Sequence, residues 1–243
     1  MGLQFVRGMQ GDDPVYLKTV ATAKHYAVHS GPEPLRHSFN ARVSEVDLRE
    51  TYLPAFRTLV VDAGVYSVMG AYNMFRDHPC CASPELFGIL RNEWGFNGYF
   101  VSDCWAISDF YMFTRSAKDP AEAAAMAVKA GTDLECGVDY KHLTEAFDRG
   151  LLTENDIDRA VKRVFTARFK LGMFDPDEKV SYAQIPFFAN CSDYNKSLSR
   201  LAAQKSIVLL KNSDNILPLP REIRTLAVIG PNADNFESLI GNY

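Results

Sequence analysis

The sequence predicts an α/β protein whose strands run parallel, in a sheet or a barrel. Between residues 19 and 172, short runs rich in β-branched and aromatic residues alternate with stretches of helical period. Each strand-like run begins apolar and ends in polar or ionisable residues, a gradient typical of sites at the carboxyl ends of parallel strands. Apolar residues make up 47% and charged residues 23% of the 243 residues, so the chain can bury a sizeable core.

Helix start signals separate the predicted strands. Ser44 comes three residues before Asp47, and Ser83 comes directly before Pro84, so both serines are expected to cap helices. Asp119, before a proline, opens an alanine-rich helix in the same way. The predicted helices are 44–60, 83–94 and 119–130, and the predicted strands are 19–26, 65–73, 98–103 and 131–136. Such alternation, with right-handed crossovers, favours a parallel sheet or barrel.

The pattern changes after about residue 150. Thr153 caps a helix whose apolar residues form one stripe, and Gly172 ends it. Residues 173–193 show no clear period and are expected to form a linker. The elements predicted after the linker are a helix over 194–205, a strand over 206–211, a turn-rich stretch over 212–220 and a strand over 226–233. One or two strands do not complete a sheet, so this region is expected to be the beginning of a second α/β layer.

Charge and composition exclude several classes of protein. The net charge is −4 and no block of Lys or Arg stands out, so a nucleic-acid partner is not expected. The longest apolar run, 206–210, is far shorter than the roughly 18 to 20 residues of a membrane span. Residues 1–8 lack the apolar core of a secretory signal. The five cysteines are scattered and form no CxxC pair, which is typical of buried free thiols.

Asp103 is the strongest candidate for a catalytic residue. It ends the predicted strand 98–103 and is followed by Cys104 and Trp105. An aspartate at this position fits the cap of a following helix. It equally fits a carboxylate nucleophile or base that lies beside an aromatic ring on which a sugar stacks. The residues alone leave both interpretations open.

Two other strand ends carry candidate ligands. Lys24 and His25 end the strand 19–26, and they would donate hydrogen bonds to substrate hydroxyls if this end faces the same pocket as Asp103. By itself the dipeptide is common and indicates little. Met69 and Tyr72 lie on the strand between the two, where each is either a core or a pocket residue. Tyr72 is the better pocket candidate because its hydroxyl needs a partner if it is buried.

Familiar cofactor and nucleophile motifs are absent from the sequence. It contains no GxGxxG, GxxxxGK[ST], HExxH or GxSxG, so dinucleotide, phosphate-loop, zinc-protease and serine-hydrolase sites are not expected. His29 and His37 near Glu33 would be the start of a metal site, but their loop spacing fixes no ligand geometry. A barrel that binds phosphorylated sugars is disfavoured because Asp133 and Glu135 would repel phosphate.

Six segments occur in a characteristic order along the chain: Ala23–Tyr26 (AKHY), Val68–Asn73 (VMGAYN), Trp94–Asp103 (WGFNGYFVSD), Ala130–Leu134 (AGTDL), Ala202–Asn212 (AAQKSIVLLKN) and Ala227–Ala233 (AVIGPNA). In combination they resemble glycoside hydrolase family 3, the β-glucosidases and β-xylosidases. The resemblance covers nearly the whole chain, whereas no single segment would identify the family.

The resemblance implies a retaining exo-β-glycosidase that removes terminal, non-reducing β-linked xylose or glucose. Asp103 would be the nucleophile that forms a covalent glycosyl–aspartate. Lys24 and His25 would bind sugar hydroxyls, while Met69 and Tyr72 would line the same subsite. The implied substrates are oligosaccharides or aryl and alkyl β-glycosides, and neither a metal nor an organic cofactor is implied. A non-catalytic sugar-binding remnant is the alternative from another class.

The family's domain plan implies an incomplete enzyme. The implied domains are 1–172, the C-terminal half of a (β/α)8 TIM-like barrel; 173–205, a linker and bridging helix; and 206–243, the truncated start of a second α/β sandwich domain. A retaining mechanism needs two carboxylates about 5 to 5.5 Å apart, and in the family the acid/base usually comes from the second domain. The sequence puts neither Glu33, Asp109 nor Glu135 at that distance from Asp103. The chain by itself is therefore expected to be a fragment with little or no turnover.

The choice of sugar depends on residues next to the nucleophile. Adjacent strand ends in a barrel would bring Cys104 and Cys136 together, so a disulfide is expected if the compartment is oxidising. Such a bridge resembles family β-xylosidases, where it would crowd the space of a glucose hydroxymethyl group. Trp105 instead resembles the stacking aromatic of the glucosidases, displaced by one position. Xylose is slightly favoured, and family analogy suggests a periplasmic or secreted full-length parent.

Overall fold

A computed structural model describes residues 1–29 and 31–240 of the chain, which divide into two compact units, Met1–Ile185 and Pro186–Tyr243. The described strands all belong to the first unit. The α/β class that the sequence predicts is therefore a property of this first unit.

Three parallel strands form the main sheet of the first unit. They are β1 (Thr22–Tyr26), β3 (Ser67–Gly70) and β6 (Tyr99–Val101), and they pair in the order β1-β3-β6. The register sets Ala23 opposite Val68 and Val68 opposite Phe100, and all three side chains are buried. The carboxyl ends of the three strands consequently meet at one edge of the sheet, as the alternation in sequence predicts.

The predicted strand 131–136 is wrong in extent, because its pairing is reduced to one bridge between Leu134 and Val101. The N–H groups of Asp133 and Leu134 both donate to Phe100 O, at 2.9 and 3.1 Å, and the chain then turns away. The two carboxylate oxygens of Glu135 accept backbone N–H groups of residues 139 and 140 and close that turn.

The predicted helices form with the predicted caps. The Ser44 hydroxyl accepts the Asp47 N–H at 3.1 Å, and the Ser83 hydroxyl accepts the Leu86 N–H at 3.3 Å. The region predicted as helix 44–60 consists of α2 (Glu45–Asp47), α3 (Pro54–Arg57) and the π-helical turns Leu48–Tyr52 and Thr58–Asp62. The region 83–94 consists of α4 (Pro84–Phe87) and the π-helical turn Gly88–Glu93. The other two helices predicted before the linker are α6 (Pro120–Ala130) and α8 (Glu154–Lys170).

Several further elements were not predicted, most of them too short to show a hydrophobic period. The helices are α1 (Gly2–Gln10), α5 (Asp109–Met112) and α7 (Leu143–Asp148), with 3-10 turns at Glu33–Leu35, Cys80–Ala82 and Asp139–His142. A second small sheet pairs β2 (Asn40–Ala41), β4 (Met74–Phe75) and β5 (His78–Pro79) in the order β2-β4-β5.

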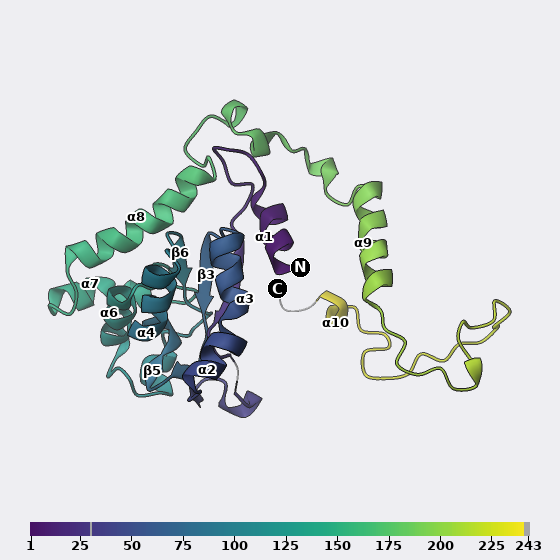
Figure 1. Cartoon of the computed structure of the whole chain (residues 1–243), viewed down its shortest axis with the longest axis horizontal. Coiled ribbons are helices and arrows are strands. Elements are labelled where there is room, and N and C mark those ends of the chain that lie inside the picture. The colour runs from purple at the N-terminus through teal and green to yellow at the C-terminus, as the bar shows by residue number, and fades with distance from the viewer. Residues whose placement is uncertain (30, 241–243) are drawn as a thin grey trace. The chain divides into compact units, whose positions relative to one another are not determined.

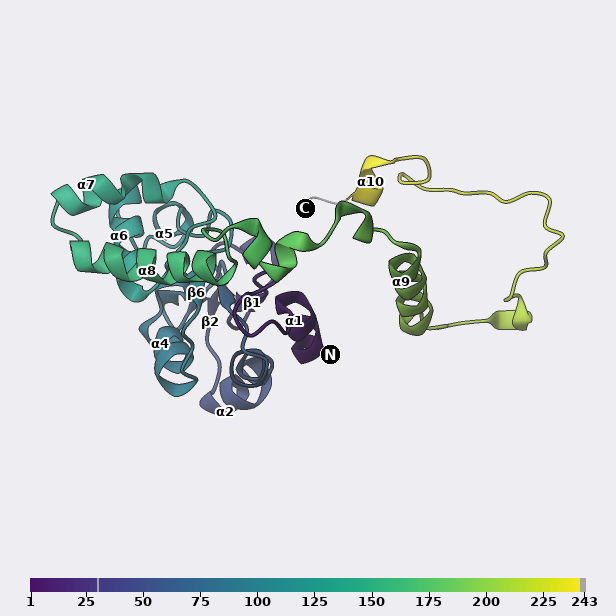
Figure 2. The same ribbon diagram turned by 90° about the horizontal axis from the view of Figure 1, so that it is seen from above.

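The core of the first unit packs around the main sheet. Tyr26, Phe75 and Phe100 are completely buried, and the Tyr26 hydroxyl donates to the carbonyl oxygen of Leu86 at 3.0 Å. Helices α6, α7 and α8 gather at one end of this unit in both views (Figures 1 and 2), and α8 contacts both α6 and β6. This packing fixes strand β6, whose carboxyl end leads to Asp103.

The second unit contains helix α9 (Asp193–Ser206), a 3-10 turn at Ser213–Asn215 and the short helix α10 (Glu237–Ile240). The predicted linker carries 3-10 turns at Asp177–Lys179, Ser181–Gln184 and Phe187–Ala189. The predicted strands 206–211 and 226–233 are wrong, since Ser206 ends helix α9 and neither 207–211 nor 226–233 forms a strand (Figure 2). Both segments expose apolar side chains such as Leu210 and Ile229. A strand requires a hydrogen-bonded neighbour, and these two do not pair with each other.

Candidate active site at the carboxyl edge of the sheet

Asp103 lies two residues beyond strand β6 and is only 7% exposed. Its Oδ2 atom is 3.3 Å from Nε2 of His25, which belongs to strand β1. Its Oδ1 atom accepts the backbone N–H of Cys104 at 2.8 Å. The backbone N–H on one oxygen and the imidazole nitrogen facing the other fix the orientation of this carboxylate.

The His25 imidazole provides its contact as a neutral group. Burial lowers the pKa of His25, although the charge of Asp103 acts in the opposite direction, and the charges of His29 and Lys24 lower it further. Because neutral imidazole carries one N–H, the Nε2 atom facing Asp103 is assigned as the donor. The His29 ring lies 4.8 Å from the His25 ring and extends the imidazole side of the site.

Tyr72 approaches the same carboxylate from the loop after strand β3. Burial, followed by the charge of Asp103 and a hydrogen bond to it, raises the pKa of Tyr72 to about 12. The phenol therefore stays protonated at neutral pH and can donate to the carboxylate. Arg36 adds positive charge that acts on both Tyr72 and Asp103, while its guanidinium binds Glu33 at 2.6 Å.

The other predicted sugar ligands lie on β1, on β3 and two residues after Asp103. Lys24 is exposed on β1, next to His25, and Met69 is half-buried on β3. Trp105 is 54% exposed and adopts a positive φ of 68°. The structure thus brings His25 and Tyr72 directly to Asp103 and leaves Trp105 at the surface beside it.

A disulfide joins Cys104 to Cys136, with their Cα atoms 4.3 Å apart. Two backbone contacts accompany it: the Trp105 N–H donates to the Cys136 carbonyl at 2.6 Å, and the Cys136 N–H donates to the Ser102 hydroxyl at 3.0 Å. The bridge therefore lies immediately beside Asp103, between the residues that follow β6 and those that follow Leu134.

Three other carboxylates considered as acids, those of Asp109, Glu135 and Glu33, have hydrogen-bond or ion-pair partners of their own. Asp109 binds Nδ1 of His37 at 2.8 Å, and burial raises the pKa of Asp109 to about 6 against the opposing effect of His37. Both oxygens of Glu135 accept backbone N–H groups, and Glu33 pairs with Arg36. None of the three is presented as a free acid to a substrate.

The sequence did not indicate that Arg36 lies near Asp103; it offered Asp109 only as a possible substitute acid, and His29 and His37 only as weak metal candidates. The His37 ring lies 4.7 Å from Tyr72 and 5.4 Å from Phe113. The available signal is that His29, Arg36 and His37 lie in the loop directly after the carboxyl end of β1, where site residues are expected.

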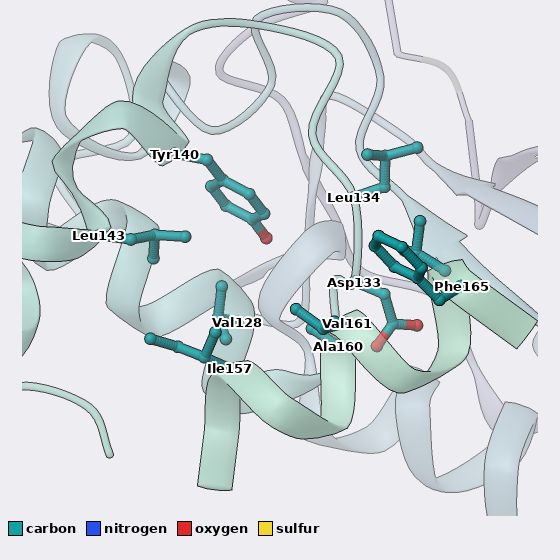
Figure 3. Close-up of a pocket in the computed structure, with 10 residues that line it drawn as sticks. Val128, Asp133, Leu134, Tyr140, Leu143, Ile157, Ala160, Val161 and Phe165 are labelled. Carbon is teal, nitrogen blue, oxygen red and sulfur yellow. The ribbon is translucent and has the colours of Figure 1, made fainter. Parts of the chain in front are cut away.

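An apolar cavity of about 190 Å³ lies elsewhere in the first unit (Figure 3). Its lining includes Val128 of α6, Leu143 of α7, and Ile157 and Val161 of α8. The carboxylate of Asp133, which also borders it, is committed to Arg91 and Arg163. A sugar needs several free polar partners, so this cavity does not have the character of a glycoside site.

Residues 1–29 and 31–240 contain neither a metal-binding cluster nor a membrane-spanning helix. Within these ranges no group of three or more His, Cys, Asp or Glu side chains is arranged to hold a metal ion. The suspected metal residues diverge, because His37 binds Asp109 while Glu33 binds Arg36. No helix in the described part of the chain has the length and apolar character needed to cross a membrane.

Sequence comparison assigns both units to one family. Residues 1–167 match the glycosyl hydrolase family 3 N-terminal domain, and residues 207–243 match the C-terminal domain of that family. The chain belongs to glycosyl hydrolase family 3. This confirms the family predicted from the order of the six segments.

Family 3 relatives include a xylan 1,4-beta-xylosidase of Xylanibacter ruminicola, 48% identical over 100% of the chain, and beta-D-xylosidase 3 of Arabidopsis thaliana, 42% identical over 98% of it. The chain spans 29% and 32% of these two proteins. Among solved structures, a family 3 exo-beta-xylosidase in complex with a xylobiose aziridine activity-based probe is 36% identical, with a TM-score of 0.87 over 99% of the chain and 32% of that protein. A beta-glucosidase from Listeria innocua in complex with glucose is 30% identical, with a TM-score of 0.74 over 89% of the chain and 30% of that protein.

Proposed function

We propose that Asp103 is the nucleophile of a retaining exo-β-glycosidase that acts on terminal, non-reducing β-linked xylose or glucose. A carboxylate oxygen attacks the anomeric carbon, the bond to the leaving oxygen breaks, and that oxygen takes up a proton. Water then attacks the same carbon, which releases the sugar and regenerates the carboxylate. Oligosaccharides and aryl or alkyl β-glycosides are the proposed substrates.

The geometry of Asp103 carries this proposal. The carboxylate is buried at the carboxyl edge of a parallel sheet, with His25 Nε2 3.3 Å from one oxygen and the Cys104 N–H 2.8 Å from the other. A helix cap, the alternative interpretation, would direct the carboxylate to the N–H two or three residues later. Its hydrogen bond to the next residue and its contact with a histidine of another strand instead support a reactive group.

Sugar contacts are proposed for the side chains around this carboxylate. Lys24, His25 and Tyr72 carry donors suited to hydroxyl groups, and Met69 supplies apolar surface on strand β3. Hydrogen bonds to hydroxyls that strengthen as the sugar ring flattens would lower the barrier to glycosyl transfer. Trp105 is proposed as a stacking surface, a role supported by its 54% exposure.

Xylose is proposed as the preferred sugar. Support comes from the similarity to xylosidases and from the disulfide between Cys104 and Cys136 beside the nucleophile, which would crowd the hydroxymethyl group of glucose. The 30% identity to a beta-glucosidase keeps glucose as the alternative. Residues 1–172 are further proposed to contribute to a (β/α)8-type barrel and 206–243 to a second α/β domain, which the two family matches support.

A covalent trapping experiment tests the nucleophile. The 243-residue chain is incubated with 2,4-dinitrophenyl 2-deoxy-2-fluoro-β-xyloside, whose leaving group departs without protonation. Labelling therefore does not require an acid catalyst and isolates the first step of the mechanism. Intact-mass and peptide mass spectrometry should find one fluoroxylosyl group, attached to Asp103.

Three variants complete the test. Asp103→Ala should abolish labelling, whereas Asp148→Asn, at an exposed aspartate of α7, should be labelled like the parent chain. His25→Ala should slow labelling about 10- to 100-fold, the range for losing a hydrogen bond to a charged group. A folded chain that takes up no label, or takes it up on another residue, would refute the proposed nucleophile.

A further inference from the structure

We propose that the Cys104–Cys136 disulfide is a positioning element for the nucleophile: it holds the Cys104 N–H against Asp103 and so keeps the carboxylate oriented for attack. This inference rests on the proposed function, since it assigns the bridge a role in the reactivity of Asp103. It differs from the crowding of a glucose hydroxymethyl group, which would change the choice of sugar and leave the reactivity toward a xyloside as it is.

The contact to be held is a single hydrogen bond inside a tight turn. The Cys104 N–H donates to Oδ1 of Asp103 at 2.8 Å, and the carbonyl oxygen of Asp103 accepts the Ala106 N–H at 3.1 Å. Trp105, in the middle of the turn, has a φ of 68°, a left-handed conformation that a residue with a side chain seldom adopts. Such a turn persists only where surrounding contacts enforce it.

Those surrounding contacts come from Cys136 and its neighbours. The Trp105 N–H donates to the Cys136 carbonyl at 2.6 Å, and the disulfide joins the adjacent residue, Cys104, to the same Cys136. Two links, the disulfide and the hydrogen bond of Trp105, therefore hold the turn to Cys136. Without the covalent link, the Cys104 N–H would be free to rotate away from the carboxylate.

Cys136 is itself firmly anchored, so it can act as a fixed support. Its N–H donates at 3.0 Å to the hydroxyl of Ser102, which is completely buried, and the Ser102 N–H donates at 3.0 Å to the carbonyl of Leu134. On its other side, the Glu135 carboxylate binds the N–H groups of Asp139 and Tyr140 at 2.8 and 2.6 Å. The bridge therefore transmits the rigidity of residues 134–140 to the nucleophile turn.

The experiment compares the parent chain with Cys136→Ser, using Cys191→Ser as the matched control at an exposed free cysteine. Labelling of Asp103 by the 2-fluoroxyloside is measured against probe concentration, which separates the saturating rate from the half-saturating concentration. Cys136→Ser should lower the saturating rate at least about tenfold, the cost of losing a hydrogen bond to a charged group, and change the half-saturating concentration less than about twofold.

Two further perturbations keep the proposal testable if Cys136→Ser fails to fold. Reduction of the parent chain by dithiothreitol transfers two electrons and two protons: the S–S bond breaks, Cys104 and Cys136 become thiols, and dithiothreitol closes to its cyclic disulfide. Ser102→Ala keeps the bridge and removes only the acceptor of the Cys136 N–H, so it should slow labelling in the same direction but by less. Both measurements are made well below the unfolding temperature of each sample.

Hydrogen exchange at the Cys104 amide supplies a readout that does not depend on activity. This amide should exchange at least about tenfold faster in Cys136→Ser than in the parent chain, while amides of the β3 strand stay unchanged. If the parent chain is not labelled at Asp103, the proposed function fails, and the exchange rates still decide the positioning role. Unchanged exchange together with an unchanged saturating rate, or a change confined to the preference for glucoside over xyloside, would overturn the inference.

Discussion

Replacing Asp133 by alanine should destabilise the first unit by about 3 to 5 kcal/mol. The Asp133 side chain is 1% exposed. Its Oδ2 accepts from Arg91 and from the Phe100 N–H, and its Oδ1 accepts from Arg163, each at 2.9 Å. This carboxylate thereby joins strand β6, the helical turn that carries Arg91, and helix α8 beneath the candidate active site.

The size of the expected loss of stability follows from how strongly burial acts on the charges of this cluster. Burial is the largest influence on both charges: it raises the pKa of Asp133 despite two arginines, and it lowers the pKa of Arg91 to about 10 despite the aspartate. The ion cluster therefore stabilises the folded state little more than a well-packed apolar group would. Removing one partner nevertheless leaves the Arg91 guanidinium, 14% exposed, without its counter-charge, and such a loss costs about 3 to 5 kcal/mol.

The assay is urea unfolding followed by tryptophan fluorescence, with Glu93→Ala as the control. Glu93 also pairs with an arginine, Arg49, but its side chain is 46% exposed, so its removal should cost no more than about 1 kcal/mol. Arg163→Met combined with Asp133→Ala should cost less than the sum of the two single changes, because the partners are coupled. If Asp133→Ala costs no more than Glu93→Ala, the reasoning from burial is refuted.

Two further predictions concern pH and backbone space. Burial raises the pKa of Asp109 from 3.8 to about 6, so the folded state binds this proton more tightly than the unfolded state does. The free energy of unfolding should therefore fall as pH rises from about 4 to 6, by at most about 3 kcal/mol. Urea titrations of Asp109→Asn over the same pH range should lack most of this fall. A Cβ on Gly98 would lie 2.1 Å from the carbonyl oxygen of Tyr66, whereas nothing lies within 4 Å of a Cβ on Gly88. Gly98→Ala should lower the melting temperature by several degrees and Gly88→Ala, in a helical segment, should leave it unchanged or raise it; equal melting temperatures for the two variants would contradict the packing argument.

Local signals predicted much of the first unit. Ser44 and Ser83 cap the helices that follow them, as their spacing predicts, because a cap depends only on residues three positions apart. The buried strands β1, β3 and β6 were also identified correctly, since each is a run of apolar residues with a polar end. Asp103 and His25 became candidates because they stand at the polar ends of such strands, and Tyr72 because it lies on the strand between them.

Contacts between distant residues could not be predicted in the same way. Asp109 is 72 residues from its partner His37, and Asp133 is 42 residues from Arg91. The local pattern does not show which of these ionisable residues pair with one another. The predicted strand 206–211 failed for a related reason, because a strand is defined by its neighbour as well as by its own residues.

The sequence by itself determined the α/β class, the order of the main strands and helices, the family and the identity of Asp103 as the leading candidate. These depend on residue type, local spacing and the order of short segments. Only the tertiary structure decided that His25 lies against one oxygen of Asp103 while the Cys104 N–H binds the other, and that Cys136 fastens the turn between them. Hydrogen bonds act over about 3 Å, a distance that is set by how the strands pack and that no spacing along the chain encodes.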